Sequence, residues 1–394
     1  MNDFVWQNRT KVYFGEKAVD KHLSSLIKEY ILPGKNRVLL GYGGGSIKKN
    51  GAYDDVARAI KDAGAEIVEF SGIMSNPTVD KMLEGVATAK ANDIGLILAV
   101  GGGSVMDCCK AMAVQLMYDG DAWQDFWIDG KEMPFDTFPC GVVVTMPATG
   151  SEVNPCAVLT NTKTNIKCDR GYPQINPRFA VMDPAYTLTM PLRQLRAGSF
   201  DILSHLMEGY FSFPLEENAT DDVANGLMYG LIRDIRMAVK NPQDKVARAN
   251  IMWHASLAEN NIVKMGKTKD FECHNMEHQL SAYTNCNHGE GLAVLHPTYY
   301  RHIYKAGLPK FVEFAVQVWR LNPADYESDE ALALAGIQSL EDFIEEIGLP
   351  RTLRELGIED ESILEEIADS CFISEGAFRP LTHEEILEIY KECF

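Results

Sequence analysis

Hydrophobic residues recur in two alternating patterns through the first half of the chain. Short apolar or alternating runs are typical of strands, and longer stretches with apolar residues three or four positions apart are typical of helices. We predict strands at residues 10–15, 37–41, 66–70, 94–100, 140–145 and 179–182, with helices at 54–63, 77–92 and 105–117. This alternation predicts a parallel sheet with helices on both faces and ligands at the carboxyl ends of its strands.

The pattern changes near residue 190. Several prolines crowd a short interval there, and strand-like runs largely vanish after it. We predict helices at 193–210, 221–240, 244–260, around His274 and His288, and within a Glu-rich end at 339–392. The charged stretches of that end are typical of solvated helix faces. The chain therefore reads as two domains, an α/β domain at 1–188 and an all-helical domain at 189–394.

Composition narrows the class of protein. A hydrophobic fraction of 46% and a charged fraction of 24% over 394 residues are those of a soluble globular chain. No apolar run has membrane-spanning length, and the start shows no signal-peptide pattern, so we expect no membrane partner. Nine scattered cysteines without C-x-x-C spacing favour a reducing cytoplasm. A formal charge of −19 disfavours nucleic acid and makes a neutral small molecule the easier substrate.

Two segments of the second half carry metal-ligand residue types. Asp201 and His205 are four positions apart and therefore share one helix face, which Glu208 extends. His274 and His278 repeat the spacing, and His288 follows beyond a Thr284-Asn285 pair that can end one helix before another begins. A single His-x-x-x-His pair is common by chance, but six of the nine histidines lie between residues 205 and 296. One carboxylate with three imidazoles predicts a catalytic metal site with room for a substrate oxygen.

Two glycine clusters follow predicted strands. They are Gly41-Tyr-Gly-Gly-Gly-Ser46 and Gly101-Gly-Gly-Ser104, and a glycine-rich turn into a helix start favours a bound pyrophosphate. Ser104 could instead act only as a helix cap. The segment from Thr145 to Asn154 is either an ordinary turn or a further source of hydrogen bonds to phosphates and ribose. Neither cluster is a clean G-x-G-x-x-G, and the Walker pattern is absent.

The order and spacing of these motifs resemble one known family. Residues 8–15, 101–107, 148–152, Asp201-x-x-x-His205 and 379–382 are similar to those of the iron-dependent (group III) alcohol dehydrogenases. The branch that they resemble most contains NADPH-dependent butanol dehydrogenases and aldehyde reductases. The resemblance implies a Rossmann-like dinucleotide-binding α/β domain, an all-helical metal-binding domain, an active-site cleft between them, and a homodimer.

The resemblance also assigns residues to roles. It implies Asp201, His205, His274 and His288 as metal ligands and His278 as a catalytic residue near the nicotinamide and the substrate. We hypothesise that His278 relays the proton. The cofactor contacts that the motifs imply are Gly44, Gly45, Ser46, Asn76, Gly103, Ser104, Val105, Thr145, Asn154, Lys167, Tyr186 and Thr189.

The identity of the cofactor and of the metal needs separate arguments. Glu69 stands roughly where an acid that binds the NAD ribose is expected. The resemblance implies, however, that members of the family that prefer NAD carry an aspartate in the first glycine loop, at the place that Gly44 occupies here. Ser46 and Lys48 can attract a 2′-phosphate. We therefore predict NADP, with NAD possible. The resemblance favours Fe(II), whereas the ligand types suit Zn(II) equally.

The predicted reaction is reversible hydride transfer between primary, butanol-like alcohols and aldehydes, with the metal as Lewis acid at the substrate oxygen. Three alternatives stay open: a glycerol or polyol dehydrogenase that uses NAD and zinc, a lyase like dehydroquinate synthase, and a metal-dependent assembly or binding protein. One departure from the family concerns His296, which stands where relatives usually carry an apolar residue. We expect it to pack against the following helix.

Overall fold

The computed structural model describes all 394 residues and divides into two compact units. Residues Gln7–Met190 form one, here called the α/β unit. Residues Pro191–Phe394 form the other, the helical unit, together with the first residues Met1–Trp6. The assignment of these parts as cofactor-binding and metal-binding domains stays a prediction.

A six-stranded parallel sheet organises the α/β unit. Its strands run in the order β1-β8-β5-β4-β2-β3, and all neighbours are parallel. The strands are β1 (Lys11–Phe14), β2 (Arg37–Tyr42), β3 (Glu66–Phe70), β4 (Leu96–Gly101), β5 (Cys140–Val144) and β8 (Phe179–Met182). Every residue of β4 and β5 is buried, which explains why these runs are apolar throughout rather than alternating. The predicted parallel sheet is confirmed.

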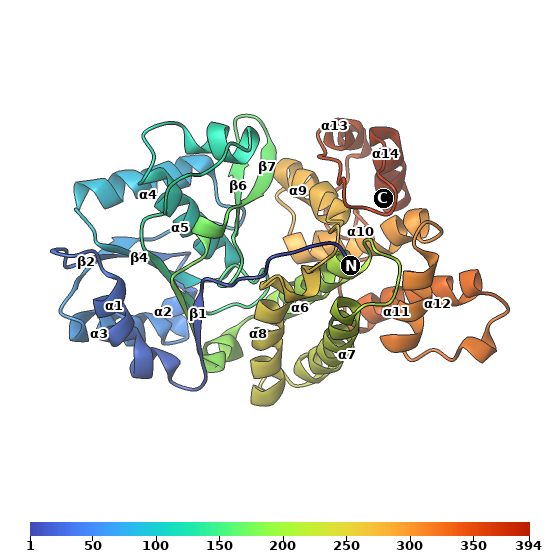
Figure 1. The fold of residues 1–394 in the computed structure, drawn as a ribbon, viewed down its shortest axis with the longest axis horizontal. Helices are drawn as coiled ribbons and strands as arrows, with labels where there is room; N and C mark the ends of the chain where they lie inside the picture. The colour runs from blue at the N-terminus through green and yellow to red at the C-terminus, as the bar shows by residue number, and fades with distance from the viewer. The chain divides into compact units, whose positions relative to one another are not determined.

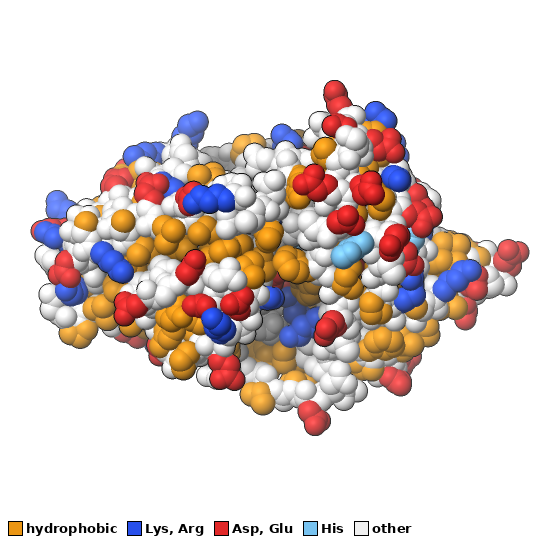
Figure 2. Space-filling view, turned by 90° about the horizontal axis from the view of Figure 1, so that it is seen from above, with side chains coloured by type: hydrophobic (Ala, Val, Ile, Leu, Met, Phe, Trp, Pro, Cys, Tyr) orange, Lys and Arg blue, Asp and Glu red, His pale blue; other side chains and the backbone are white.

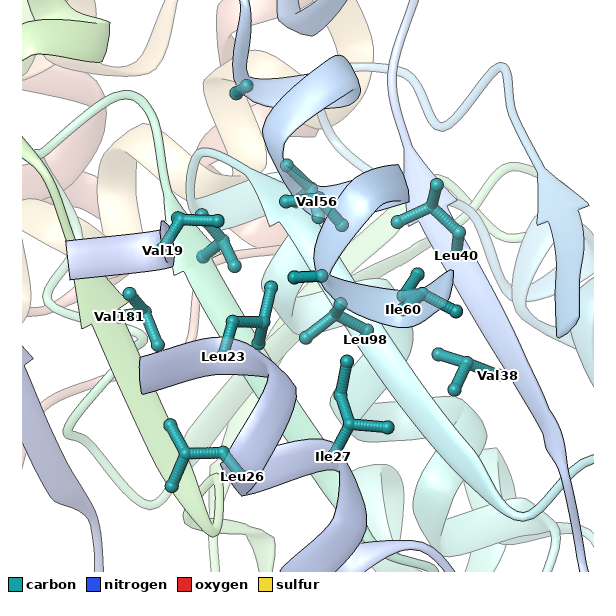
Figure 3. Packing of buried hydrophobic residues seen from close by; sticks show 14 of the residues in the cluster. Val19, Leu23, Leu26, Ile27, Val38, Leu40, Val56, Ile60, Leu98 and Val181 are labelled. Atoms are coloured by element: carbon teal, nitrogen blue, oxygen red, sulfur yellow. The ribbon is translucent and has the colours of Figure 1, made fainter. Parts of the chain in front are cut away.

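Helices cover both faces of this sheet (Figure 1). On one face lie α1 (Ser24–Tyr30), the π-helical turn before it, and α3 (Ala52–Asp62). Their apolar side chains, among them Leu23, Ile27 and Ile60, pack on Val38 and Leu98 of the sheet (Figure 3). On the other face lie α4 (Val79–Ala91) and α5 (Gly103–Gln115). The unit is therefore Rossmann-like, as predicted.

The direction in which the chain adds strands changes between β2 and β4. From β2 the chain continues to β3 on one side, and then crosses back so that β4 lies on the other side of β2. Ligands of open α/β sheets bind at the carboxyl ends of the strands at such a switch point. Residues 43–46 and 102–104, the two glycine clusters, follow β2 and β4 directly. The topology therefore places both clusters at the edge where a dinucleotide is expected.

The sequence analysis missed one element of this unit. An antiparallel hairpin is formed by β6 (Cys156–Asn161) and β7 (Ile166–Gly171), where we predicted no strand. Asn165 adopts a left-handed conformation (φ 52°) in the turn between them. In β7, the charged side chains of Lys167, Asp169 and Arg170 break the apolar alternation that signals a strand. The sequence of β6 contains no charged residue, so this reason does not apply to it.

The helical unit contains no strand of either sheet. Its helices are α6 (Leu192–Tyr210), α7 (Ala219–Lys240), α8 (Lys245–Glu259), α9 (Glu272–Thr284), α10 (His288–Ile303), α11 (Leu308–Gln317), α12 (Asp329–Glu346), α13 (Leu364–Asp369) and α14 (His383–Glu392). Helix α6 lies at the centre: every residue from Ala197 to Tyr210 is buried. Helices α7, α8 and α10 pack directly against it. The predicted all-helical second half is confirmed.

Charged side chains lie on the outside of the later helices. Glu365, Glu366 and Asp369 of α13 are exposed, and Figure 2 shows acidic side chains, with fewer basic ones between them, over the surface on this side. The Glu-rich stretches are thus solvated helix faces, as predicted. None of the helices combines the length and apolar character that crossing a membrane would require.

A substitution of Gly141 in β5 tests how tightly the sheet is packed. A Cβ added there would lie 2.1 Å from the Phe179 ring, which fills the space beside it. We expect Gly141→Ala to lower the free energy of unfolding by about 1–3 kcal/mol, because the ring must leave its position. Urea unfolding followed by circular dichroism measures this change. Gly44→Ala is the matched control, because nothing lies within 4 Å of its added Cβ; an equal loss in both variants would contradict the packing argument.

Candidate functional site

Polar side chains occupy the most buried helix of the helical unit. Asp201, His205 and Glu208 lie on α6 and are 2%, 7% and 0% exposed. Their spacing of four and three residues places them along one face. Buried carboxylates and imidazoles are costly unless they are paired or bind an ion, so this face needs partners from neighbouring helices.

Helices α9 and α10 supply those partners. Asn285 ends α9 in a left-handed conformation (φ 53°), and the Asn287 side chain accepts from the Glu290 N–H and so starts α10 at His288. The sequence predicted this break at Thr284-Asn285. His274 and His278 lie on α9, so three histidines come from one helix-turn-helix segment (Figure 1).

A glycine allows the start of α10 to approach α6 closely. A Cβ added to Gly289 would lie 2.1 Å from the backbone oxygen of Ala197, one turn before Asp201. No larger residue fits there without moving a helix. The glycine therefore lets His288, its neighbour in sequence, reach Asp201.

All three predicted histidine ligands lie close to the Asp201 carboxylate. The ligand atoms of Asp201, His205 and His274 form one compact group, and His288, which also approaches Asp201, groups with Glu277 and His278. The Nε2 atoms of His205 and His274 are 3.1 Å apart. Asp201 Oδ1 lies 3.7 Å from Nε2 of His274 and 3.5 Å from Nε2 of His288. Ligand atoms bound at 2.0–2.1 Å to a tetrahedral ion are about 3.3–3.4 Å apart. The observed separations are close to that edge length.

Two further carboxylates fix the orientation of the imidazoles. Nδ1 of His274 donates to Glu208, and Nδ1 of His288 donates to Glu277. Because an ionised carboxylate only accepts, each Nδ1 carries a proton, and in the neutral ring each Nε2 then presents a lone pair toward Asp201 Oδ1. That oxygen is buried and has no hydrogen-bond partner. With the imidazoles neutral, three acceptors face one another and need a cation, so these residues fit a divalent metal ion.

The electrostatics of the cluster agree with this reading. Burial lowers the pKa of His274, but the carboxylates of Glu208 and Asp201 more than offset it and raise that pKa to about 10. Burial likewise raises the pKa of Glu208, and His274 outweighs it and lowers the pKa to about 2. The cluster therefore attracts positive charge, whether a proton or a metal ion supplies it.

Two other histidines lie beside the four ligands. His278 is 6% exposed, and its ring centroid is 5.5 Å from that of His288 and 6.0 Å from that of His274. It is adjacent to the ligand cluster, as a proton-relaying residue requires. His296 is fully buried on α10, and its Nε2 lies 2.6 Å from the hydroxyl of Ser204. His296 therefore contacts α6, and its predicted packing against the following helix stays a prediction.

Sequence reasoning did not assign roles to the two glutamates. Glu208 appeared only as an extension of the Asp201 stripe, and Glu277 only inside the segment from His274 to His278. Their signal was present: Glu208 lies seven positions after Asp201, two turns along the same face. The histidine that each carboxylate contacts lies on another element or after a turn, and no spacing rule identifies such a pair.

In the α/β unit, both glycine clusters lie at the switch point of the sheet. Gly44, Gly45 and Ser46 lead from β2 into the short helix α2 (Ser46–Lys49), with Gly45 at φ 104°. Gly103, Ser104 and Val105 form the first turn of α5. A Cβ on Gly103 would lie 2.4 Å from the Thr149 side chain, so this backbone requires glycine.

The other predicted cofactor residues come from several different elements of the α/β unit. Thr145 follows β5, and its N–H donates to the oxygen of Gly101 at 2.9 Å, next to the second glycine cluster. Asn76 precedes α4, close to a bridge between Thr78 and Thr160 of β6. Lys167 is a buried residue of β7, and Thr189 ends the 3-10 turn Pro184–Thr189.

Tyr186 has a different environment from that expected of a cofactor contact. Its ring is in the apolar cluster under the sheet, and its hydroxyl donates to Asp55 at 2.8 Å. Its backbone oxygen accepts from Asn50, directly after α2, so Tyr186 supports the first glycine cluster from below.

The structure also reveals a buried lysine that sequence reasoning overlooked. Nζ of Lys110 is fully buried and donates at 3.0–3.1 Å to the backbone and side-chain oxygens of Ser151 and Asn154. Asp107, one turn earlier on α5, accepts from the Ser151 hydroxyl at 2.5 Å. Burial lowers the pKa of Lys110, and Asp107 opposes that shift. Together Asp107 and Lys110 fix the segment that contains Asn154.

The carboxylate of Glu69, the acid that favoured NAD, already has hydrogen-bond partners within the protein. The hydroxyls of Tyr42 and Tyr53 both donate to its carboxylate. The ammonium of Lys48 lies over the Tyr53 ring, 4.7 Å from its centroid. Glu69 therefore belongs to a polar cluster at the end of β3 that includes a cation.

Comparison with known families matches both halves of the chain. Residues 9–184 match a family model described as iron-containing alcohol dehydrogenase. Residues 196–394 match the model for the C-terminal part of the Fe-containing alcohol dehydrogenase family. The two models together cover both units.

Relatives match over the whole length. NADH-dependent butanol dehydrogenase A of Clostridium acetobutylicum is 37% identical, and the match covers 100% of both chains. NADPH-dependent aldehyde reductase YqhD of Escherichia coli is 34% identical, over 92% of this chain and 91% of the relative. Among solved structures, NADH-dependent butanol dehydrogenase A of Thermotoga maritima superposes with a TM-score of 0.92 at 34% identity, over 100% of this chain and 99% of that one.

A substitution of Lys110 tests whether this side chain stabilises the segment that contains Asn154. We expect Lys110→Met to lower the free energy of unfolding by about 3–5 kcal/mol, because it leaves buried oxygens and the Asp107 carboxylate without their cation. Urea unfolding measures the change. Lys90→Met, at an exposed position of α4, is the matched control and should shift stability by no more than about 0.5 kcal/mol. Equal effects of the two changes would contradict the role of Lys110.

Proposed function

The chain belongs to the iron-containing alcohol dehydrogenase family, whose members interconvert alcohols and aldehydes with NAD(P)(H), and we propose that Asp201, His205, His274 and His288 bind its divalent metal. The observation that carries this proposal is the buried, unpartnered Oδ1 of Asp201 opposite the imidazole Nε2 atoms. We favour Fe(II), after the family, with Zn(II) as the alternative that these ligand types equally suit.

The protein's residues divide the work of the reaction. A divalent ion held by these ligands supplies a Lewis acid for the substrate oxygen. Glu208 and Glu277 hold the imidazoles so that their Nε2 atoms point inward. The glycine clusters at the switch point would hold the pyrophosphate of the nicotinamide cofactor, with Asn154 kept in place by Lys110. The substrate is a neutral primary alcohol or aldehyde of butanol-like size.

His278 is the proposed proton relay. Its ring lies beside that of His288, and His278, His288 and Glu277 form a second group of possible ligands, apart from the one formed by Asp201, His205 and His274. An imidazole in this position can accept the alcohol proton in oxidation and return it in reduction.

We propose NADP(H) as the preferred cofactor, with NAD(H) as the alternative. The loop after β2 carries no carboxylate at Gly44, and Ser46 and Lys48 provide a donor and a cation nearby. The engagement of Glu69 by two tyrosine hydroxyls supports this choice, because a carboxylate that already accepts two hydrogen bonds is less available to a ribose. Relatives carry both NADH-dependent and NADPH-dependent names, so family membership alone does not decide.

Two further expectations accompany the enzyme. We propose a reducing cytoplasmic location, which the nine cysteines support because none forms a disulfide. We propose a homodimer on the basis of the family resemblance.

The central test is oxidation of NADPH and NADH by a panel of aldehydes, after removal of metal by a chelator and reconstitution with Fe(II) or Zn(II). We expect no turnover without metal, recovery with Fe(II), and a higher kcat/KM for butanal with NADPH than with NADH. Asp201→Asn and His274→Ala should lose bound metal and activity together. Full activity in the metal-free protein would overturn the metal proposal, and a preference for glycerol oxidation with NAD would favour the polyol dehydrogenase alternative.

His278→Ala separates proton transfer from metal binding. We expect kcat to fall about 10²–10⁴-fold, since general acid–base catalysis typically contributes that much. Metal content, measured by elemental analysis, should stay equal to that of the wild type. His302→Ala, which removes the imidazole that contacts Glu392, is the control and should leave kcat unchanged. Unchanged turnover in His278→Ala would remove this residue from the mechanism.

A further inference from the structure

We propose that Glu208 and Glu277 are positioning residues that set the metal affinity of the site by holding His274 and His288 in one tautomer and one orientation. The inference rests on the proposed metal site and goes further, because it assigns the affinity to two carboxylates that do not themselves face the ion. Each of them is fully buried.

Each imidazole has two ring nitrogens, Nδ1 and Nε2. Neutral imidazole carries one proton, on Nδ1 or on Nε2, and only the other nitrogen can bind a metal. The Glu208 carboxylate accepts from Nδ1 of His274, and the Glu277 carboxylate accepts from Nδ1 of His288. Each contact therefore keeps a proton on Nδ1 and makes Nε2 the nitrogen that an ion takes.

The third histidine provides a contrast within the same site. Nδ1 of His205 is buried and has no hydrogen-bond partner, and its nearest carboxylate oxygen, Asp201 Oδ1, is 3.8 Å away. His205 is thus not held by a carboxylate. His274 of α9 and His288 of α10 are each held by a glutamate carboxylate, so the geometry of the site depends mainly on these two contacts.

Glu208 is itself held from two sides. Its Oε1 accepts from the backbone N–H of His274 at 3.1 Å, so one carboxylate fixes both the backbone and the ring of the same residue. Its Oε2 lies 3.4 Å from the hydroxyl of Ser204, which in turn contacts Nε2 of His296 at 2.6 Å. This buried chain keeps Glu208 from turning away from His274. It also gives His296 a role as the far end of that support.

The charges of the two glutamates add to the effect of orientation. A carboxylate that accepts from Nδ1 makes the imidazole a more basic ligand, and losing such a partner typically costs about 10–100-fold in metal affinity. Glu208→Gln and Glu277→Gln keep the size and an acceptor oxygen but remove the charge. We therefore expect each to weaken metal binding by about 10-fold, and Glu208→Ala, which also removes the acceptor, by about 100-fold.

The experiment measures Co(II) binding to the full chain by competition with a chromogenic chelator, and records the visible absorption of the bound Co(II), which reports ligand geometry. Wild type, Glu208→Gln, Glu277→Gln and Glu208→Ala are compared. Thermal unfolding of each metal-free variant shows that it folds, and Glu208→Gln keeps the test valid where the alanine variant does not fold.

Glu272→Gln is the matched control. Glu272 is a fully buried glutamate on the same helix, α9, but it accepts from the Ser374 N–H at 2.6 Å instead of from an imidazole. The proposal predicts wild-type Co(II) affinity and spectrum for Glu272→Gln, and weaker binding with an altered spectrum for the Glu208 and Glu277 variants.

Two outcomes distinguish the positioning role of the glutamates from the metal site itself. Glu208 and Glu277 variants that bind Co(II) as tightly as Glu272→Gln, with the same spectrum, would overturn the positioning role while leaving the metal site intact. A wild-type chain that binds no Co(II) would overturn the metal proposal itself, and with it the inference.

Discussion

The helical unit contains a cluster of buried carboxylates whose ion-pair partners are imidazoles. Asp201, Glu208 and Glu277 are all buried, and the partners they face are imidazoles. Placing carboxylates in a protein interior costs several kcal/mol each unless a cation or strong hydrogen bonds compensate. The cluster is therefore compensated either by protonated histidines or by a divalent ion.

Close backbone approach makes both candidate sites possible. Gly289 brings the start of α10 onto α6, and Gly103 brings the start of α5 against Thr149. In each case the neighbouring functional residue, His288 or Ser104, begins a helix whose position depends on the absence of a side chain. Buried side chains hold both regions in place. They are Glu208 with Ser204 in the helical unit, and Asp107 with Lys110 in the α/β unit. The reactive groups are thus fixed by residues that do not take part in the chemistry.

The sequence predicted the parts that depend on local pattern. The strands of the parallel sheet, the long helices and the break at Asn285 follow from periodicity and capping, which act over a few residues. The pairing of Asp201 with His205 follows from helical spacing, and the approach of His274 and His288 was an inference from ligand types and from family resemblance. In the missed β6–β7 hairpin, the charged residues of β7 obscure the alternation. Glu277, eleven positions before His288, and Lys110, far in sequence from Asn154, act through contacts that only the folded chain creates.

The central claim is that Asp201 and the three imidazoles converge on one ion. The most direct measurement is the anomalous scattering of a crystal of the metal-loaded protein, collected at the absorption edge of the bound metal. We expect a single strong peak about 2.0–2.2 Å from a carboxylate oxygen of Asp201 and from Nε2 of His205, His274 and His288. A fully loaded crystal whose peak lies elsewhere, or out of reach of Asp201, would contradict the account.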